Sequence, residues 1–93
     1  MVIRTQVSRS RLFEKQLAKV PDFIRMKVET WLFSVESKGI REVMKSSGFH
    51  DEPLKGEREG QRSIRLSLAY RLIYRVVLDR VHIELLEVNK HDY

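Results

Sequence analysis

The sequence predicts a single α+β domain over residues 1–93, of order β-α-α-β-β-β, with an N-terminal helical hairpin packed on one face of a mostly antiparallel sheet. Two changes of pattern along the chain predict this fold. Apolar residues recur at helical spacing on both sides of Pro21, and from Arg62 onward the period switches to two. A length of 93 residues is enough for one modest core. Hydrophobic residues make up 42% of the chain and charged residues 33%, which favours a folded protein over a disordered one.

The first strand and the first helix are expected before Pro21. Residues 2–7 alternate apolar and polar side chains and are rich in β-forming types, so they predict a short strand. Ser8 or Ser10 is then placed to cap a helix. The apolar residues of that helix fall near one face, at Leu12, Phe13, Leu17 and Val20.

A second helix is predicted between Pro21 and Gly39. Proline suits the first helical position, and glycine suits the residue that ends a helix. The apolar stripe of this helix consists of Ile24, Val28, Trp31, Leu32 and Val35. The tryptophan is therefore predicted to pack in the core, and the two helices form a hairpin with one apolar side.

Residues 40–61 predict a polar loop that begins with a short helical turn. Three glycines and Pro53 interrupt any longer element, and ionisable side chains are frequent. Loops of this kind on a small scaffold commonly carry function.

Three strands are predicted from Arg62 to the C-terminal region. In the first, one face carries Ile64, Leu66 and Leu68, and the other Ser63, Arg65 and Ser67. In the second, one face carries Tyr70, Leu72, Tyr74 and Val76, and the other Arg71, Ile73, Arg75 and Val77. Asp79-Arg80 allows a tight hairpin to a last strand over residues 81–88. Unpaired arginine is costly to bury, so Arg65, Arg71 and Arg75 are expected on the face that the helices leave open.

The charge distribution favours a polyanionic or acidic partner. The net charge is +5, and residues 1–47 hold ten Lys/Arg against five Asp/Glu, whereas residues 48–93 hold eight of each. Residues 53–75 nevertheless contain a local basic cluster of Lys55, Arg58, Arg62, Arg65, Arg71 and Arg75 against two glutamates. Guanidinium groups gathered on one sheet face would suit phosphate.

Several classes of site are excluded by composition. The chain has no cysteine, which excludes disulfides, thiolate zinc sites and cysteine nucleophiles. No apolar stretch approaches the roughly 20 residues of a membrane span, and residues 1–11 lack the apolar core of a signal peptide. A cytoplasmic protein without a membrane partner is therefore expected. A metal cluster of His50, Asp51 and Glu52 with His82 or His91 is disfavoured, because adjacent residues rarely converge on one ion.

The second half of the chain resembles the toxins of the RelE/ParE superfamily. The resemblance is carried by HDEPLKGE (50–57), RSIRL (62–66), AYRLIYRV (69–76) and a C-terminal strand followed by a histidine and a terminal tyrosine. The predicted order of elements extends it over the whole chain. The nearest branch is the ribonuclease one, which includes RelE, YoeB and HigB toxins.

The resemblance implies a function, partners and a mechanism. It implies the toxin of a type II toxin–antitoxin system, neutralised by a cognate antitoxin in a hetero-oligomer. The ribonuclease toxins enter the ribosomal A site and cleave mRNA by attack of a 2′-hydroxyl on the adjacent phosphate, without a metal or other cofactor. The ParE branch shares the fold but inhibits DNA gyrase.

The resemblance also implies roles for individual residues. Glu52 corresponds to a carboxylate taken as the general base, and Lys55 and Arg71 form an electrostatic clamp on the scissile phosphate. His91 and Tyr93 are candidate acids or bases, since the YoeB-like proteins end in adjacent His and Tyr. Here Asp92 separates the two, which leaves open whether both act or Tyr93 alone. The RNA-binding residues expected outside the clamp are Arg62, Arg65, Arg75 and Lys90.

Three functions stay open at this level. The first is a ribosome-dependent endoribonuclease, and the second is a gyrase-binding toxin that cuts nothing itself. The third is an RNA-binding or antitoxin-bound module without activity. The set of Glu52, Lys55, Arg71 and Tyr93 favours the first, because cleavage without a metal needs a base, cations and an acid from side chains.

Overall fold

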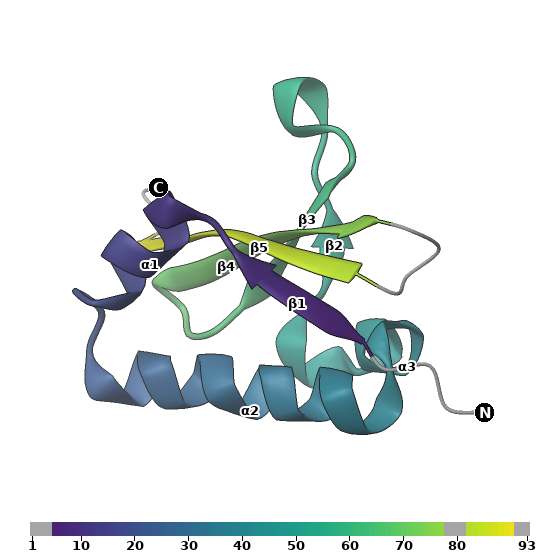
Figure 1. The fold of residues 1–93 in the computed structure, drawn as a ribbon, viewed down its shortest axis with the longest axis horizontal. Helices are drawn as coiled ribbons and strands as arrows, with labels where there is room; N and C mark the ends of the chain where they lie inside the picture. The colour runs from purple at the N-terminus through teal and green to yellow at the C-terminus, as the bar shows by residue number, and fades with distance from the viewer. Residues whose placement is uncertain (1–4, 78–81, 91–93) are drawn as a thin grey trace.

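The computed structural model describes residues 5–77 and 82–90, and it places a five-stranded sheet over a layer of helices (Figure 1). The strand order is β1-β5-β4-β3-β2. β1 pairs with β5 in parallel, and the other described pairs are antiparallel. The elements are β1 (Gln6–Arg9), α1 (Arg11–Leu17), α2 (Asp22–Lys38), α3 (Ile40–Lys45), β2 (Glu52–Pro53), β3 (Gln61–Arg65), β4 (Tyr70–Val77) and β5 (His82–Lys90), with short 3₁₀ turns at Ser47–Phe49 and Gly56–Arg58. The predicted α+β fold is confirmed.

The helix boundaries follow local signals. Ser10 caps α1, because its Oγ accepts a hydrogen bond from the Phe13 backbone N–H at 2.9 Å. α2 begins directly after Pro21 and ends at Gly39, whose φ of 85° lies in a region that glycine adopts readily. The predicted helical turn after Gly39 is α3.

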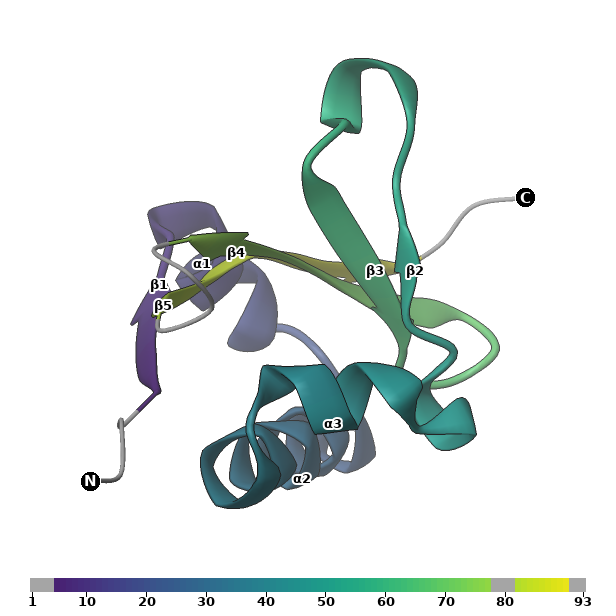
Figure 2. The same ribbon diagram turned by 90° about the vertical axis from the view of Figure 1, so that its right-hand side faces the viewer.

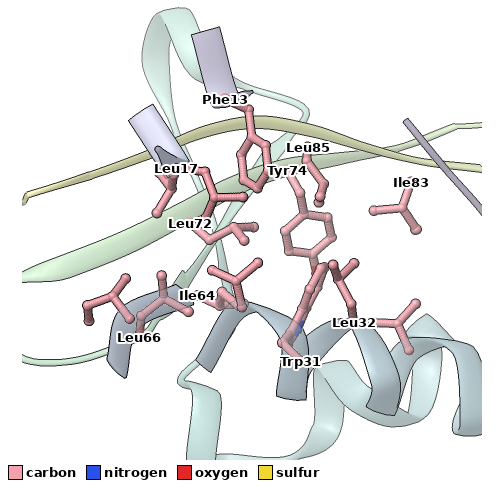
Figure 3. Packing of buried hydrophobic residues seen from close by; sticks show 14 of the residues in the cluster. Phe13, Leu17, Trp31, Leu32, Ile64, Leu66, Leu72, Tyr74, Ile83 and Leu85 are labelled. Atoms are coloured by element: carbon pink, nitrogen blue, oxygen red, sulfur yellow. The ribbon is translucent and has the colours of Figure 1, made fainter. Parts of the chain in front are cut away.

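One cluster of buried side chains joins the helices to one face of the sheet (Figure 3). All five residues of the predicted α2 stripe are buried. Trp31 and Tyr74 lie at its centre, fully buried, with ring centroids 4.9 Å apart. The prediction that Trp31 is a core residue is therefore confirmed.

The predicted position of Leu68 on the apolar face is wrong. Its side chain is 79% exposed, whereas Ile64 and Leu66 are buried. β3 ends at Arg65, and the chain then turns, with the Ser67 Oγ accepting hydrogen bonds from the backbone N–H groups of Ala69 and Tyr70. The alternation of faces along β3 therefore ends before Leu68 and does not determine where its side chain points.

β5 contains an irregularity that the sequence pattern did not predict. Ile73 pairs with Glu87 and Tyr74 pairs with Leu85, so the register passes over Leu86. Ser10 takes up the freed carbonyl of Leu86 with a 2.7 Å hydrogen bond from its Oγ. The bulge is therefore held in place by the N-cap of α1.

The bulge reverses the faces that β5 presents. Leu85 and Val88 both point into the core although they are three positions apart, and the Val88 backbone N–H donates to the Gln16 Oε1 at 2.9 Å. Glu87 and Asn89 consequently lie on the opposite face, where they pair with β4. None of the helices in the described ranges is long and apolar enough to cross a membrane.

Candidate functional site

The face of the sheet turned away from the helix layer is called the open face here. Side chains alternate along each strand, and cross-strand partners share a face. The open face is therefore the one that bears Glu52, Ser63, Arg65, Arg71, Ile73, Arg75, Glu84, Glu87 and Asn89. The predicted placement of Arg65, Arg71 and Arg75 on one face agrees with this register.

Two arginines stand directly opposite one another at one end of the open face. Arg65 of β3 pairs with Arg71 of β4, and Asn89 of β5 continues the row. Like charges opposite one another destabilise a sheet, so a retained Arg–Arg pair favours an anion beside it. The buried Arg65 Nε finds no hydrogen-bond partner within the described residues. This row is the candidate anion-binding feature of the open face.

Arg71 is oriented by the turn that precedes its own strand. Its Nη1 donates to the Ser67 carbonyl at 2.9 Å and to the Tyr70 carbonyl at 3.3 Å. The guanidinium therefore has a defined position at the start of β4. A guanidinium group has the geometry to hold two oxygens of one phosphate.

Glu52 lies on the open face at the sheet edge, one row from the arginines. It pairs with Ser63, which stands two residues from Arg65 along β3. Its side chain is exposed, and so is Lys55 in the loop that follows. Figure 2 shows that this loop rises away from α2, on the open side of the sheet. Glu52 and Lys55 form no ion pair with each other in the structure.

Two other basic residues of the cluster are paired with glutamates. Arg58 forms an ion pair with Glu87 and donates to the Gln61 Oε1 at 2.8 Å. Arg58 lies in the 3₁₀ turn between β2 and β3, and Glu87 lies on β5 opposite Ile73 of β4. The contact therefore reaches from that turn across β3 and β4. Arg75 forms an ion pair with Glu84 at 2.7 Å. These pairs reduce the local positive charge around Arg58 and Arg75.

Arg62 is directed to the other face and is not brought together with Arg65 and Arg71. It pairs with Tyr74, and its Nε donates to the Asp51 Oδ1 at 2.6 Å. The Asp51 side chain is 0% exposed, and the Tyr74 hydroxyl donates to its other oxygen. Burial lowers the pKa of Arg62, but the hydrogen bond and the charge of Asp51 outweigh it and raise that pKa above the ordinary arginine value.

The buried phenol of Tyr74 gives this network a pH signature. Burial, and next the hydrogen bond to Asp51, raise the pKa of Tyr74 above the value of a free tyrosine, about 10. A raised folded-state pKa contributes stability that is fully present below the unfolded pKa. That stability is lost as the pH rises, because the unfolded chain releases a proton that the folded protein retains.

We expect Tyr74→Phe to flatten the loss of stability at alkaline pH. Above a pH of about 10, the free energy of unfolding of the wild-type protein should fall more steeply than that of the variant, by up to about 1.4 kcal/mol per pH unit. Denaturant unfolding of both proteins from neutral to alkaline pH measures the difference. Parallel pH profiles would show that Tyr74 does not cause the loss.

The remaining predicted site residues lie at the end of β5 or beyond it. Lys90 is exposed and pairs with Tyr70. His91 and Tyr93 lie outside the described residues. His82, in β5, makes a 2.9 Å hydrogen bond between its Nε2 and the Ser8 Oγ. Within the described ranges, no three His, Cys, Asp or Glu side chains gather where they could hold a metal ion.

Two features of the site were not predicted from the sequence. Asp51 entered only as an unlikely metal ligand, yet it is the buried acceptor that ties the start of β2 to the sheet. The sequence did carry one indication of this role. Asp51 is adjacent to Glu52, and adjacent residues of an extended chain point to opposite faces. The second feature is Asn89, which the bulge at Leu86 brings opposite Arg71.

The arrangement of these elements matches that of solved toxin structures. A chain of the toxin–antitoxin complex RelBE2 from Mycobacterium tuberculosis is 23% identical, with a TM-score of 0.69 over 96% of this chain and 100% of that one. The YoeB/ParE toxin from Agrobacterium tumefaciens gives 16% identity and a TM-score of 0.76, over 95% and 100%. The protein has the RelE-like toxin fold.

Further matches have the same fold. A chain of the YoeB dimer from Staphylococcus aureus is 22% identical, with a TM-score of 0.71 over 97% of this chain and 99% of that one. Several matching structures are complexes with a partner, including YoeB-YefM from the same bacterium. No protein-family model matches the sequence, and no curated protein matches it. The RelE-like fold is thus established by structure, and the activity has to be argued from the site.

Proposed function

We propose that the protein is the toxin of a type II toxin–antitoxin pair and acts as a metal-independent endoribonuclease on mRNA at the ribosomal A site. The observation that carries the proposal is the cross-strand pair of Arg65 and Arg71 on the open face, one row from the exposed carboxylate of Glu52. The RelE-like fold and the sequence resemblance to the ribonuclease toxins support it.

The proposed reaction assigns a task to each group. Glu52 takes the proton of a ribose 2′-hydroxyl, and the 2′-oxygen attacks the adjacent phosphorus. Arg71, supported by Arg65 and Lys55, stabilises the negative charge that builds on the phosphorane oxygens. The bond from phosphorus to the 5′-oxygen then breaks, which leaves a cyclic phosphate and a 5′-hydroxyl. Tyr93 or His91 supplies the proton to the departing 5′-oxygen.

Other basic residues are proposed to contact RNA away from the reacting phosphate. Lys90 is exposed at the end of β5, and Arg75 is partly neutralised by Glu84, so both suit weaker contacts. Arg62 is left out of this set, because its guanidinium is engaged by Asp51 on the other face.

The proposed partner in the cell is a cognate antitoxin that binds the toxin and blocks its activity in a hetero-oligomer. Several proteins of this fold are known in such complexes, among them RelBE2 and YoeB-YefM. We place the protein in the cytoplasm, where translating ribosomes supply its substrate.

Brief expression in bacteria followed by mapping of transcript 5′ ends tests the proposed function. New ends in frame within translated regions are the expected result. Intact mRNA together with gyrase-linked DNA breaks would instead favour a gyrase inhibitor of the ParE type. Arrested growth with neither product would favour an RNA-binding module without nuclease activity.

Deleting Tyr93 alone is expected to impair cleavage more than antitoxin binding. The deletion removes the proposed proton donor but none of the described core residues. The rate of mRNA cleavage by translating ribosomes with added toxin, compared with affinity for the antitoxin, measures the two effects. Full cleavage activity in the truncated protein would remove Tyr93 from the mechanism, and His91→Gln in the same assay would then test the other candidate.

A further inference from the structure

A shallow groove separates the C-terminal end of α1 from the ends of β4 and β5. Its space is about 190 Å³, and its lining includes Lys19, Val20, Tyr70, Val88, Asn89 and Lys90. Pockets that enclose whole small molecules usually measure about 300–1,000 Å³. The groove is thus suited to one unit of a polymer that continues outside it, and less so to a free metabolite.

The rim of the groove is cationic. Lys19 and Lys90 are both exposed, and neither forms an ion pair with another described residue. No acidic side chain belongs to the described lining. Two ammonium groups without a carboxylate between them favour a negatively charged occupant.

The floor of the groove is apolar and includes one aromatic ring. Val20 and Val88 are buried members of the core, and Tyr70 packs against the same cluster while remaining partly exposed. Tyr70 is also the cross-strand partner of Lys90, so a ring and an ammonium group lie on neighbouring strands. A flat ring beside positive charge is a common way to hold a nucleotide, since the base stacks and the phosphate is neutralised.

The groove shares one residue with the proposed catalytic row. Asn89 belongs to the lining and stands opposite Arg71 on the open face. Its Nδ2 donates to the Glu87 Oε1 at 2.9 Å, so its side chain has a defined position. Tyr70, Val88 and Lys90 lie on the helix side of the sheet, so a strand whose phosphate lies at Arg65 and Arg71 reaches the groove by passing around the end of β5 at Asn89.

We infer that this groove binds one nucleotide of single-stranded RNA next to the cleaved position, with its phosphate between Lys19 and Lys90 and its base against Tyr70. The inference rests on the proposed function, and it adds a subsite formed by α1 and the strand ends. An acidic protein segment would meet the same charges. RNA is favoured because the groove shares Asn89 with the Arg65–Arg71 row and carries an aromatic ring.

Binding of 2′-O-methylated oligouridylates of increasing length tests the subsite. These probes carry phosphates and bases but no free 2′-hydroxyl for the attack, so binding is measured without cleavage. Lys19→Gln and Lys90→Gln should each weaken binding of the longer probes, measured by fluorescence anisotropy. Each should also reduce the slope of log affinity against log salt by about 1. Binding of the shortest probe should change little.

Lys27→Gln is the matched control. Lys27 is an exposed lysine of α2 with no ion pair among the described residues, and the groove lining does not include it. This variant should keep wild-type affinity and salt slope. Comparing the three variants shows whether a loss of affinity comes from the groove itself or from removing any one positive charge.

Three results would overturn the inference. The first is that Lys19→Gln and Lys90→Gln bind every probe as the wild-type protein does, and the second is that the wild-type protein binds no probe. The third is that the two variants lose affinity only for a short polyglutamate peptide, which would assign the groove to an acidic protein segment. In each case in-frame mRNA cleavage by the wild-type protein would leave the proposed function standing, whereas intact mRNA would remove the function itself.

Discussion

Arg71→Ala is expected to reduce mRNA cleavage by about 10²–10³-fold, the usual effect of removing a group that stabilises charge only in the transition state. Arg71 is the cross-strand partner of Arg65 on the open face, and hydrogen bonds to the carbonyls of Ser67 and Tyr70 position its side chain. Alanine leaves no cation at this position. The rate of cleavage by translating ribosomes with added toxin measures the loss.

A lysine substitution separates the effect of the guanidinium's shape on cleavage from the effect of its charge. Arg71→Lys keeps the charge but cannot hold two phosphate oxygens in one fork, so its activity should lie between those of the wild-type protein and Arg71→Ala. Arg41→Ala is the matched control, because Arg41 is an exposed arginine of α3 on the helix side. It should cleave as the wild-type protein does.

Folding has to be checked for this variant, since Arg71 also contacts the turn before β4. Thermal unfolding and antitoxin binding close to those of the wild-type protein would show that the fold is retained. A folded Arg71→Ala protein with normal cleavage would contradict the proposal that Arg71 stabilises the charge on the scissile phosphate. The proposed chemistry would then need another cation, for which Lys55 and Arg65 are the candidates.

The sequence was most informative where one side chain decides one local feature. Gly39 ends α2, Ser10 caps α1, and the spacing of the apolar residues of α2 selects its buried face. The alternation in β4 likewise placed Arg71 and Arg75 on one face and Leu72 on the other. Each signal depends on residues near one another in the chain, which is why the pattern alone could predict the α+β fold.

Features that depend on distant segments could not be predicted in this way. Passing over Leu86 brings Asn89 opposite Arg71, and the carbonyl left free is satisfied by Ser10, which lies 76 residues away in the chain. Arg62 is a partly similar case, because alternation with Ile64 already predicts its face, whereas its pairing with the buried Asp51 depends on a distant segment. In the sequence it belongs to a run of basic residues, but it lies opposite Tyr74 on the face where Asp51 is buried.

Asp51 is a charged residue whose loss should strongly affect stability. Its carboxylate is fully buried and accepts hydrogen bonds from the Arg62 guanidinium and the Tyr74 hydroxyl. Asp51→Ala leaves a buried hydroxyl and a partly buried cation without this acceptor. Removing one partner of a fully buried ion pair costs about 3–5 kcal/mol. Arg62 retains 27% exposure, so solvent compensates part of that cost.

We therefore expect Asp51→Ala to lower the free energy of unfolding by about 2–4 kcal/mol. For a domain of this size the loss corresponds to a fall in Tm of roughly 10–20 °C. Thermal and denaturant unfolding measure it. Glu59→Ala is the matched control, because Glu59 is an exposed carboxylate of the neighbouring loop without an ion pair among the described residues, and it should change stability little.

The same substitution should also affect cleavage at temperatures where the variant is folded. β2 is held to β3 by only two paired positions, Glu52 with Ser63 and Pro53 with Arg62, and by the Leu54 backbone N–H donating to the Gln61 carbonyl. Asp51 adds the side-chain anchor directly before Glu52. Without it the carboxylate of Glu52 is less well positioned, and a small displacement of a reacting group is costly in rate.

Comparison with Tyr74→Phe separates anchoring from general loss of stability. That variant loses one hydrogen bond to Asp51 but keeps the ion pair between Asp51 and Arg62, so β2 stays attached. Well below both unfolding transitions, Asp51→Ala should cleave more slowly than Tyr74→Phe. Equal cleavage by the two folded variants would show that Asp51 stabilises the domain without positioning Glu52.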